Sequence, residues 1–173
     1  MHAAQLEREL ENLGIDTGAF AARGLRPVEE ARRLEVVQRD ADGREHRLTP
    51  DAAGAWRTMR QAAEGDGITL FVVSAYRSVE RQIGIIRRKL DAGKTLEQIL
   101  IENAPPGYSE HHTGRALDLG TSGEPLLELT FGETAAFAWL HRHAPEFDFL
   151  LSYPENNAQG FQYEPWHWCY QAR

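Results

Sequence analysis

Apolar and polar residues follow a helical period at the start of the chain and a strand-like alternation soon after it. Three leucines, spaced four and three positions apart among charged residues, predict an amphipathic N-terminal helix: Leu6, Leu10 and Leu13. Residues 33–49 instead predict two short strands around the dipeptide Asp42-Gly43, which suits a tight hairpin turn. The chain is therefore expected to begin with a helix and a β-hairpin.

Start signals predict two helices in the next part of the chain. Thr49 supplies an N-cap and Pro50 suits the first helical position, which predicts a helix over residues 50–64. Ser78 supplies the N-cap of a second helix over residues 79–90. Both segments have the length of ordinary globular helices.

Two further segments match the capping-box pattern, in which a threonine is followed three residues later by Gln or Glu. Thr95 with Gln98 predicts the start of one helix. Thr130 with Glu133 predicts the start of another, which should end before Pro145.

The segment 68–73 is apolar on both faces, which predicts a buried central strand that leads into residues 74–78. The remaining strand candidates are residues 116–119, 147–151 and 166–170. Helices and strands do not alternate regularly, so we expect an α+β fold in a single domain, with a mainly antiparallel sheet flanked by helices.

Composition and charge narrow the class of protein. The 173 residues are 42% hydrophobic and 26% charged, which suits one domain that folds without a disulfide or a structural metal. A formal net charge of −7 argues against a nucleic-acid partner. No apolar run suits a secretory leader or a membrane span, so the sequence as it stands predicts a cytoplasmic protein; a trimmed leader would imply a periplasmic or extracellular one. The sequence carries no signal for an oligomeric state.

Two histidines and an aspartate are the candidate metal ligands. Gly114 permits a tight turn, so the loop residue His111 can fold back over Asp118 in the strand that follows. His167 lies on a distant strand and points away from the aromatic residues beside it. Two imidazoles and a carboxylate are the open three-ligand set of a catalytic zinc. Cys169 fits a packed core thiol better than a fourth ligand, because it could share one ion with His167 only with distortion.

Two charged residues leave alternatives open. Glu164, three residues before His167, is either a general base for an attacking water or a surface acid in the turn before Pro165. Arg77 emerges from a buried strand and keeps its charge, so it needs an anionic partner. That partner is a structural carboxylate, a substrate carboxylate or a tetrahedral oxyanion.

Several motifs together resemble one family. The run Ser109-x-His111-x-x-Gly114-x-Ala116-x-Asp118 is similar to the S-x-H-x-x-G-x-A-x-D signature of the zinc D-alanyl-D-alanine carboxypeptidases of the VanY type. The run Glu164-Pro165-Trp166-His167 resembles their E-x-W-H element, and "SAYRS", Gln82 and "FLLSYP" occur in the family's order. The resemblance spans roughly residues 48–170. It divides the chain into an N-terminal helix and hairpin extension, 1–47, and a catalytic core, 48–173.

The resemblance implies metal-binding and catalytic roles. His111, Asp118 and His167 would bind Zn²⁺ at the face of the sheet. Glu164 would be the catalytic base and acid. Arg77 would polarise the scissile carbonyl and stabilise the oxyanion.

The resemblance also implies a substrate. Ser109, Gln82 and Tyr153 would hold the end of a peptidoglycan stem peptide from which D-alanine is released. Two substrates compete: a pentapeptide ending in D-Ala-D-Ala, and a tetrapeptide whose last bond joins an L-centre to D-Ala. Ala75 stands where glycine is usual in the family, which leaves the chemistry intact. The alternative is a non-catalytic zinc-containing module that binds or senses cell-wall peptides, and the presence of both catalytic candidates favours the enzyme.

Overall fold

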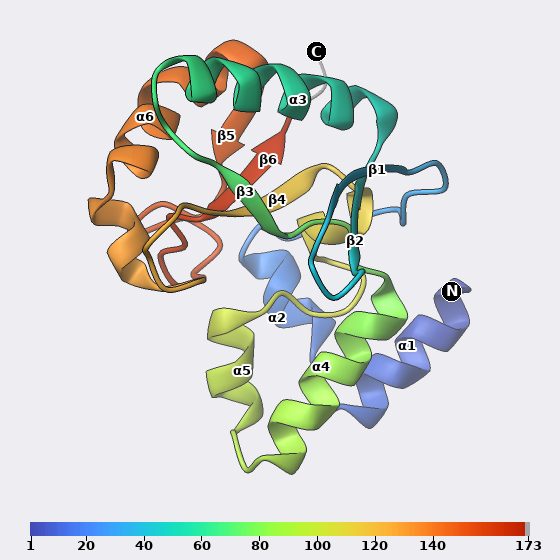
Figure 1. Cartoon of the computed structure of the whole chain (residues 1–173). Helices are drawn as coiled ribbons and strands as arrows, with labels where there is room; N and C mark the ends of the chain where they lie inside the picture. Colours follow the sequence, from blue (N-terminus) through green and yellow to red (C-terminus); the bar gives the residue numbers. More distant parts are fainter. Residues whose placement is uncertain (172–173) are drawn as a thin grey trace.

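The computed structural model describes residues 1–171, in which helices flank a four-stranded sheet (Figure 1). Helices α3 (Pro50–Gly65) and α6 (Ala135–His143) lie on one side of the sheet. The other side holds α1 (Ala3–Asn12), α2 (Thr17–Ala22), α4 (Val79–Asp91) and α5 (Leu96–Glu102). The α+β class predicted from the sequence is confirmed.

All neighbouring strands in the main sheet are antiparallel, in the order β3-β4-β6-β5. Their bounds are β3 Phe71–Ser74, β4 Ala116–Gly120, β5 Phe149–Leu151 and β6 His167–Tyr170. The predicted hairpin forms a separate two-stranded sheet from β1 (Glu35–Arg39) and β2 (Glu45–Leu48). Three short 3₁₀ helices complete the elements: η1 Glu110–Thr113, η2 Leu129–Glu133 and η3 Ala144–Phe147.

The register between β4 and β6 separates a core face from a polar face. Leu117 lies opposite Trp168, and both belong to the hydrophobic core that includes Trp56 of α3. The next pair along the strands is Asp118 opposite His167. Because successive side chains point to opposite faces, this carboxylate and imidazole meet on the face turned away from that core.

The prediction that residues 68–73 form a central strand is wrong. β3 begins at Phe71 and lies at the edge of the sheet. Its open side is covered by Gln38 of β1, whose side-chain amide donates to Val72 O at 2.7 Å and accepts from Val72 N at 2.8 Å. The half-buried ring of Phe71 packs over Gly120 of β4, on the face opposite to the buried Val72. The hairpin thus protects an edge that could otherwise pair with another chain.

One of the two predicted capping boxes is present. Thr95 and Gln98 form it at the start of α5, with both reciprocal hydrogen bonds. The prediction at Thr130 is wrong, because residues 129–133 form η2 and α6 begins only at Ala135. Thr134 caps α6 instead, through a 3.0 Å hydrogen bond from Phe137 N to its hydroxyl.

A second hydrophobic cluster joins the N-terminal helices to the rest of the chain. Its buried members are Leu10, Leu13, Ile15, Phe20, Leu25, Val79, Ile83, Ile86, Ile99, Tyr153 and Phe161. Helix α2, which was not predicted from the sequence, contributes Phe20. No helix within residues 1–171 is long and apolar enough to cross a membrane.

Candidate active site

Three buried side chains on the polar face of the sheet form a group that could hold a metal ion. One ligand atom from each of His111, Asp118 and His167 lies within 4.8 Å of the others. Asp118 Oδ2 lies 3.2 Å from His111 Nε2, and Asp118 Oδ1 lies 3.0 Å from His167 Nδ1. Two imidazole nitrogens and a carboxylate suit zinc, with a fourth position open. Within residues 1–171, Cys169 does not join this group.

A short turn brings His111 to the sheet. His111 lies in η1, which ends at Gly114 in the left-handed backbone region with φ of 65°. The Nδ1 atom of His111 lies 2.7 Å from Ala75 O, so that ring nitrogen donates to the carbonyl. In a neutral ring, the lone pair on Nε2 is then available to a metal ion on the side that faces Asp118. The turn and this backbone hydrogen bond together fix the orientation of the first ligand.

Gly114→Ala is expected to destabilise the protein by more than the about 1–2 kcal/mol that a left-handed backbone costs a residue with a Cβ. A Cβ at this position would also lie 2.8 Å from Leu34 Cδ2 and 3.2 Å from Ala31 Cβ. Gly123→Ala is the matched control, since its φ is +85° and no atom lies within 4 Å of the added Cβ. Chemical denaturation measures both variants. Equal losses would contradict a packing constraint at Gly114.

The charges of the group favour a cation at its centre. Burial alone would raise the pKa of Asp118, but the charges and hydrogen bonds of His111 and His167 hold that pKa well below its usual range. Burial opposes the charged form of His167 as well, yet hydrogen bonds and charge from Asp118 and Glu110 raise its pKa to about 10. Burial lowers the pKa of His111. The carboxylate environment therefore favours positive charge where a metal ion would lie.

Glu164 lies beside this group in the turn that precedes β6. Its Oε2 is 3.8 Å from His167 Nδ1, and its backbone N–H donates to Tyr153 O at 3.0 Å. Burial raises the pKa of Glu164 to about 7. A carboxyl group with such a pKa can both accept and release a proton near neutral pH.

Arg77 approaches the group from the loop that follows β3. Its guanidinium donates to Gln82 Oε1 at 2.8 Å and lies 3.9 Å from Asp118 Oδ2. The Arg77 backbone N–H donates to His111 O at 3.1 Å, which ties this loop to η1. Gln82 is itself held by a 2.8 Å hydrogen bond from its amide nitrogen to Ala104 O. The arginine is thus oriented toward the candidate metal-binding group by a fixed glutamine.

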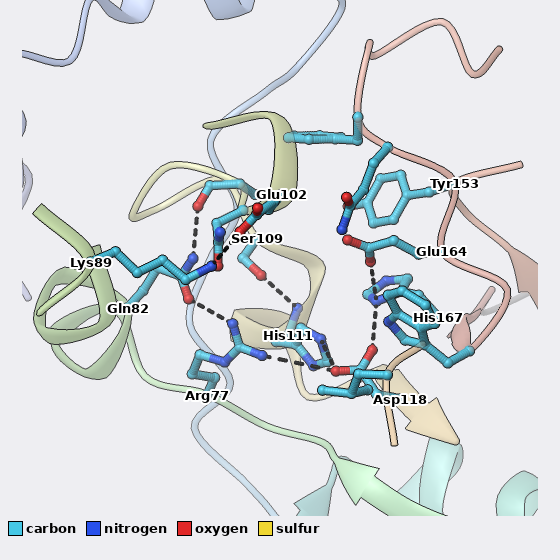
Figure 2. Close-up of a pocket in the computed structure, with 16 residues that line it drawn as sticks. Arg77, Gln82, Lys89, Glu102, Ser109, His111, Asp118, Tyr153, Glu164 and His167 are labelled. Carbon is cyan, nitrogen blue, oxygen red and sulfur yellow. Dashed lines mark hydrogen bonds and ion pairs between the residues drawn. The ribbon is translucent and has the colours of Figure 1, made fainter. Parts of the chain in front are cut away.

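One cavity of about 230 Å³ contains every candidate site residue predicted from the sequence (Figure 2). These residues are Arg77, Gln82, Ser109, His111, Asp118, Tyr153, Glu164 and His167. The Tyr153 ring lies 4.7 Å from the His167 ring, between centroids, and the Ser109 hydroxyl accepts from His111 N at 3.3 Å.

His112 is directed away from the cavity despite its place next to a metal-binding candidate. Its Nδ1 lies 2.6 Å from Arg77 O, and its Nε2 accepts from Gly107 N at 3.2 Å. Burial lowers the pKa of His112 to about 4. It is therefore a buried neutral link between two loops.

Three charged residues at or beside the cavity were not predicted from the sequence. Lys89 and Glu102, a 2.8 Å ion pair, line the same cavity. Lys89 follows Gln82 by seven residues and so shares its helix face, a spacing that could have indicated it. Glu110 contacts His167 from outside the cavity. Its place between Ser109 and His111 in the sequence could have indicated that it lies near the site.

Comparisons with known proteins identify related carboxypeptidases. The model of the family described as VanY: D-alanyl-D-alanine carboxypeptidase matches residues 45–173. The putative carboxypeptidase YodJ of Bacillus subtilis (strain 168) is 36% identical over 132 residues, covering 73% of this chain and 47% of that protein. A D-alanyl-D-alanine carboxypeptidase of Enterococcus faecium is 30% identical over 123 residues, covering 69% of this chain and 36% of that protein. The chain thus spans about half or less of the length of these relatives.

Solved structures share the fold. The LdcB LD-carboxypeptidase has a TM-score of 0.73 and 32% identity, covering 82% of this chain and 69% of its own. The vancomycin-resistance D,D-pentapeptidase VanY from a VanB-type cassette, in complex with Zn(II), has a TM-score of 0.64 and 26% identity, covering 84% of this chain and 82% of its own. From the family match over residues 45–173 and these relatives, the chain belongs to the VanY family of D-alanyl-D-alanine carboxypeptidases.

Proposed function

We propose that this protein is a zinc-dependent carboxypeptidase that hydrolyses the C-terminal D-alanine from peptidoglycan stem peptides or muropeptides. One observation carries the proposal: the Glu164 carboxyl, with its pKa raised by burial, shares a cavity with the group of His111, Asp118 and His167. A proton-transfer group beside an open three-ligand site is the arrangement that metal-assisted hydrolysis requires.

The proposed ligand atoms are His111 Nε2, a carboxylate oxygen of Asp118 and His167 Nδ1, the atoms that face one another in the structure. When bound, zinc supplies Lewis-acid chemistry that polarises a carbonyl and lowers the pKa of water. The protein holds these ligands in place through the β4–β6 register and the hydrogen bond from His111 to Ala75 O.

Glu164 performs the proton transfers in the proposed mechanism. Its carboxylate takes a proton from the attacking water and gives a proton to the amine of the departing D-alanine. Burial favours the neutral form after the first transfer, and the pKa of about 7 allows the second. The peptide bond is thereby exchanged for a carboxylate and a free amine without a covalent enzyme intermediate.

Arg77 and the polar residues around it complete the proposed site. The guanidinium of Arg77, fixed by Gln82, stabilises negative charge that develops on the carbonyl oxygen. Gln82, Ser109 and Tyr153 line the same cavity and are proposed to hold the end of the peptide.

The names of the relatives support a substrate that ends in D-alanine. Another solved relative, VanYB, is described in complex with D-alanine-D-alanine, with 27% identity and a TM-score of 0.63. LdcB is named an LD-carboxypeptidase, and the VanB-cassette VanY a D,D-pentapeptidase. A free C-terminal D-alanine is what the two activities share, and we propose the same feature for this chain.

Release of free D-alanine is the direct test of the proposed function. Purified zinc-loaded protein is expected to release D-alanine from a defined muropeptide tetrapeptide, a pentapeptide or both, with the products identified by mass spectrometry. A chelator should abolish the release, and added zinc should restore it. A peptide ending in L-alanine is the matched control and should remain intact.

If zinc-loaded protein releases D-alanine from neither peptide, the proposed carboxypeptidase activity is contradicted. That result would favour a module that only binds cell-wall peptides. Release from one length alone would identify the scissile bond as D,D or L,D.

A further inference from the structure

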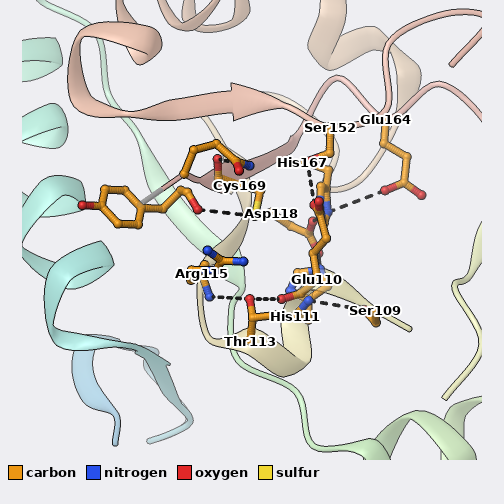
Figure 3. Close-up of polar contacts among 12 residues, drawn as sticks. Ser109, Glu110, His111, Thr113, Arg115, Asp118, Ser152, Glu164, His167 and Cys169 are labelled. Atoms are coloured by element: carbon orange, nitrogen blue, oxygen red, sulfur yellow. Dashed lines mark hydrogen bonds and ion pairs between the residues drawn. The ribbon is translucent and has the colours of Figure 1, made fainter. Parts of the chain in front are cut away.

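A carboxylate outside the cavity contacts the far side of the third proposed metal ligand. Glu110 Oε2 lies 2.9 Å from His167 Nε2, whereas Asp118 Oδ1 lies 3.0 Å from His167 Nδ1 (Figure 3). The same Glu110 oxygen accepts a 2.6 Å hydrogen bond from the hydroxyl of Ser152. One imidazole is thus held between two carboxylates, one on each ring nitrogen.

The two ring nitrogens then have different tasks. A neutral imidazole carries one N–H, and the hydrogen bond made by one nitrogen decides which lone pair is free for a metal. Without a metal ion both ring nitrogens of His167 face carboxylates. With a metal ion bound beside Asp118, the Glu110 acceptor would keep the one remaining proton on Nε2 and leave the Nδ1 lone pair for the ion. In His111 the acceptor is a backbone carbonyl. Ala75 O accepts from Nδ1, which leaves the lone pair of Nε2 available for the metal ion.

The acceptor at Nε2 is a carboxylate held in place by two partners. Glu110 Oε2 accepts from the Ser152 hydroxyl at 2.6 Å and lies 2.9 Å from His167 Nε2. An ionised acceptor makes a stronger hydrogen bond than a neutral one and raises the basicity of the ligand nitrogen.

We propose that Glu110, itself held by Ser152, is a positioning residue that selects the Nδ1-binding tautomer and the orientation of His167 for the metal ion. The inference rests on the proposed function only in that zinc is the ion. Glu110 is not a fourth ligand, because its oxygen bonds to Nε2 and it lies outside the three-residue group found among residues 1–171.

Zinc affinity measured by competition with a chromogenic chelator tests this role without any peptide substrate. Glu110→Ala is expected to weaken zinc binding by about 10–100-fold. Glu110→Gln should weaken it less, since the amide oxygen can still accept from Nε2–H although it lacks the charge. Ser152→Ala, which removes only the hydroxyl that holds the carboxylate, should give a smaller loss in the same direction.

The matched control is Glu146→Gln, which alters a glutamate–histidine contact of the same length on the surface, 2.9 Å from Glu146 Oε1 to His143 Nδ1. Its zinc affinity should equal that of the wild type. Thermal unfolding of the metal-free proteins and visible absorption of the Co²⁺-substituted proteins separate positioning from general stability. Glu110→Gln should unfold near the wild-type temperature without metal, show a smaller stabilisation by zinc, and have an altered Co²⁺ spectrum.

Zinc affinity of Glu110→Ala within threefold of the wild type would overturn the inference. Should Glu110→Ala fail to fold, unchanged affinity and an unchanged Co²⁺ spectrum in both Glu110→Gln and Ser152→Ala would overturn it equally. These results can be distinguished from a failure of the proposed function. If the wild type binds zinc, Glu110 substitution weakens that binding and the wild type releases no D-alanine, the inference about Glu110 stands. The proposed carboxypeptidase activity is then contradicted.

Discussion

Glu164→Gln is expected to reduce the release of D-alanine by about 10²–10⁴-fold, the usual contribution of a positioned general acid–base group, while the protein keeps its zinc. Glutamine has nearly the shape of glutamate but cannot accept the proton of the attacking water. Glu164 Oε2 also lies 3.8 Å from His167 Nδ1, farther than the Asp118 carboxylate lies from either proposed histidine ligand. The substitution should therefore separate turnover from metal binding.

Two measurements on the same sample check this separation. Zinc content by mass spectrometry should stay at the wild-type value, and initial rates with the preferred D-alanine peptide should fall mainly in kcat. Glu155→Gln is the matched control, since it is the same change at an exposed position in the preceding loop and should leave the rate unchanged. Full activity of Glu164→Gln would show that another group transfers the protons.

His167→Ala is expected to lose both zinc and activity. The imidazole supplies one of only three proposed protein ligands, so its removal should weaken zinc binding by more than the about 100-fold upper range for a group that merely orients a ligand. The loss should therefore exceed that of Glu110→Ala. Activity should fall to the level of the metal-free protein, and excess zinc should not fully restore it.

A second histidine provides the control for this substitution. His141 lies on α6, is exposed and contacts none of the proposed ligands, so His141→Ala should retain both zinc and rate. Metal content after dialysis and the D-alanine release assay report the two properties separately. A His167→Ala protein that retained zinc with wild-type affinity would refute its assignment as a ligand.

The grouping of His111, Asp118 and His167 could be predicted from the sequence because its geometry is mostly local. Because side chains alternate along a strand, those of His167 and Trp168 point to opposite faces of the sheet. Gly114 allows the turn before Asp118. The structure adds the register that makes Asp118 and His167 direct cross-strand neighbours. That register depends on pairing between segments about fifty residues apart, which local patterns do not determine.

Tertiary packing explains the elements that were predicted wrongly. Residues 68–73 are mostly apolar, and this pattern does not reveal that Gln38 rather than a strand occupies the open edge of β3. Near residue 130, burial of Phe131 in the core accompanies the tightening of residues 129–133 into η2, and the cap moves to Thr134. The helix cap therefore lies four residues later than the capping-box pattern predicts.

Glu110 shows why the surroundings of a metal-binding group are harder to predict than the group itself. It lies within the signature, directly before His111, yet its carboxylate is directed at His167 by contacts with residues 42 and 57 positions later in the chain. The cavity wall at Lys89 and Glu102 likewise depends on how α4 and α5 pack together. The positions of these side chains depend on the fold, so the local spacing of residues in the sequence gives little indication of them.

The central claim is that a single zinc ion held by His111, Asp118 and His167 is required for hydrolysis of a bond to C-terminal D-alanine. Titration of metal-free protein with zinc, with D-alanine release followed at each step, tests it most directly. We predict no release without metal, a linear rise to one zinc per chain, and a plateau beyond that ratio. Full release by the metal-free protein, or none at one bound zinc per chain, would contradict the claim.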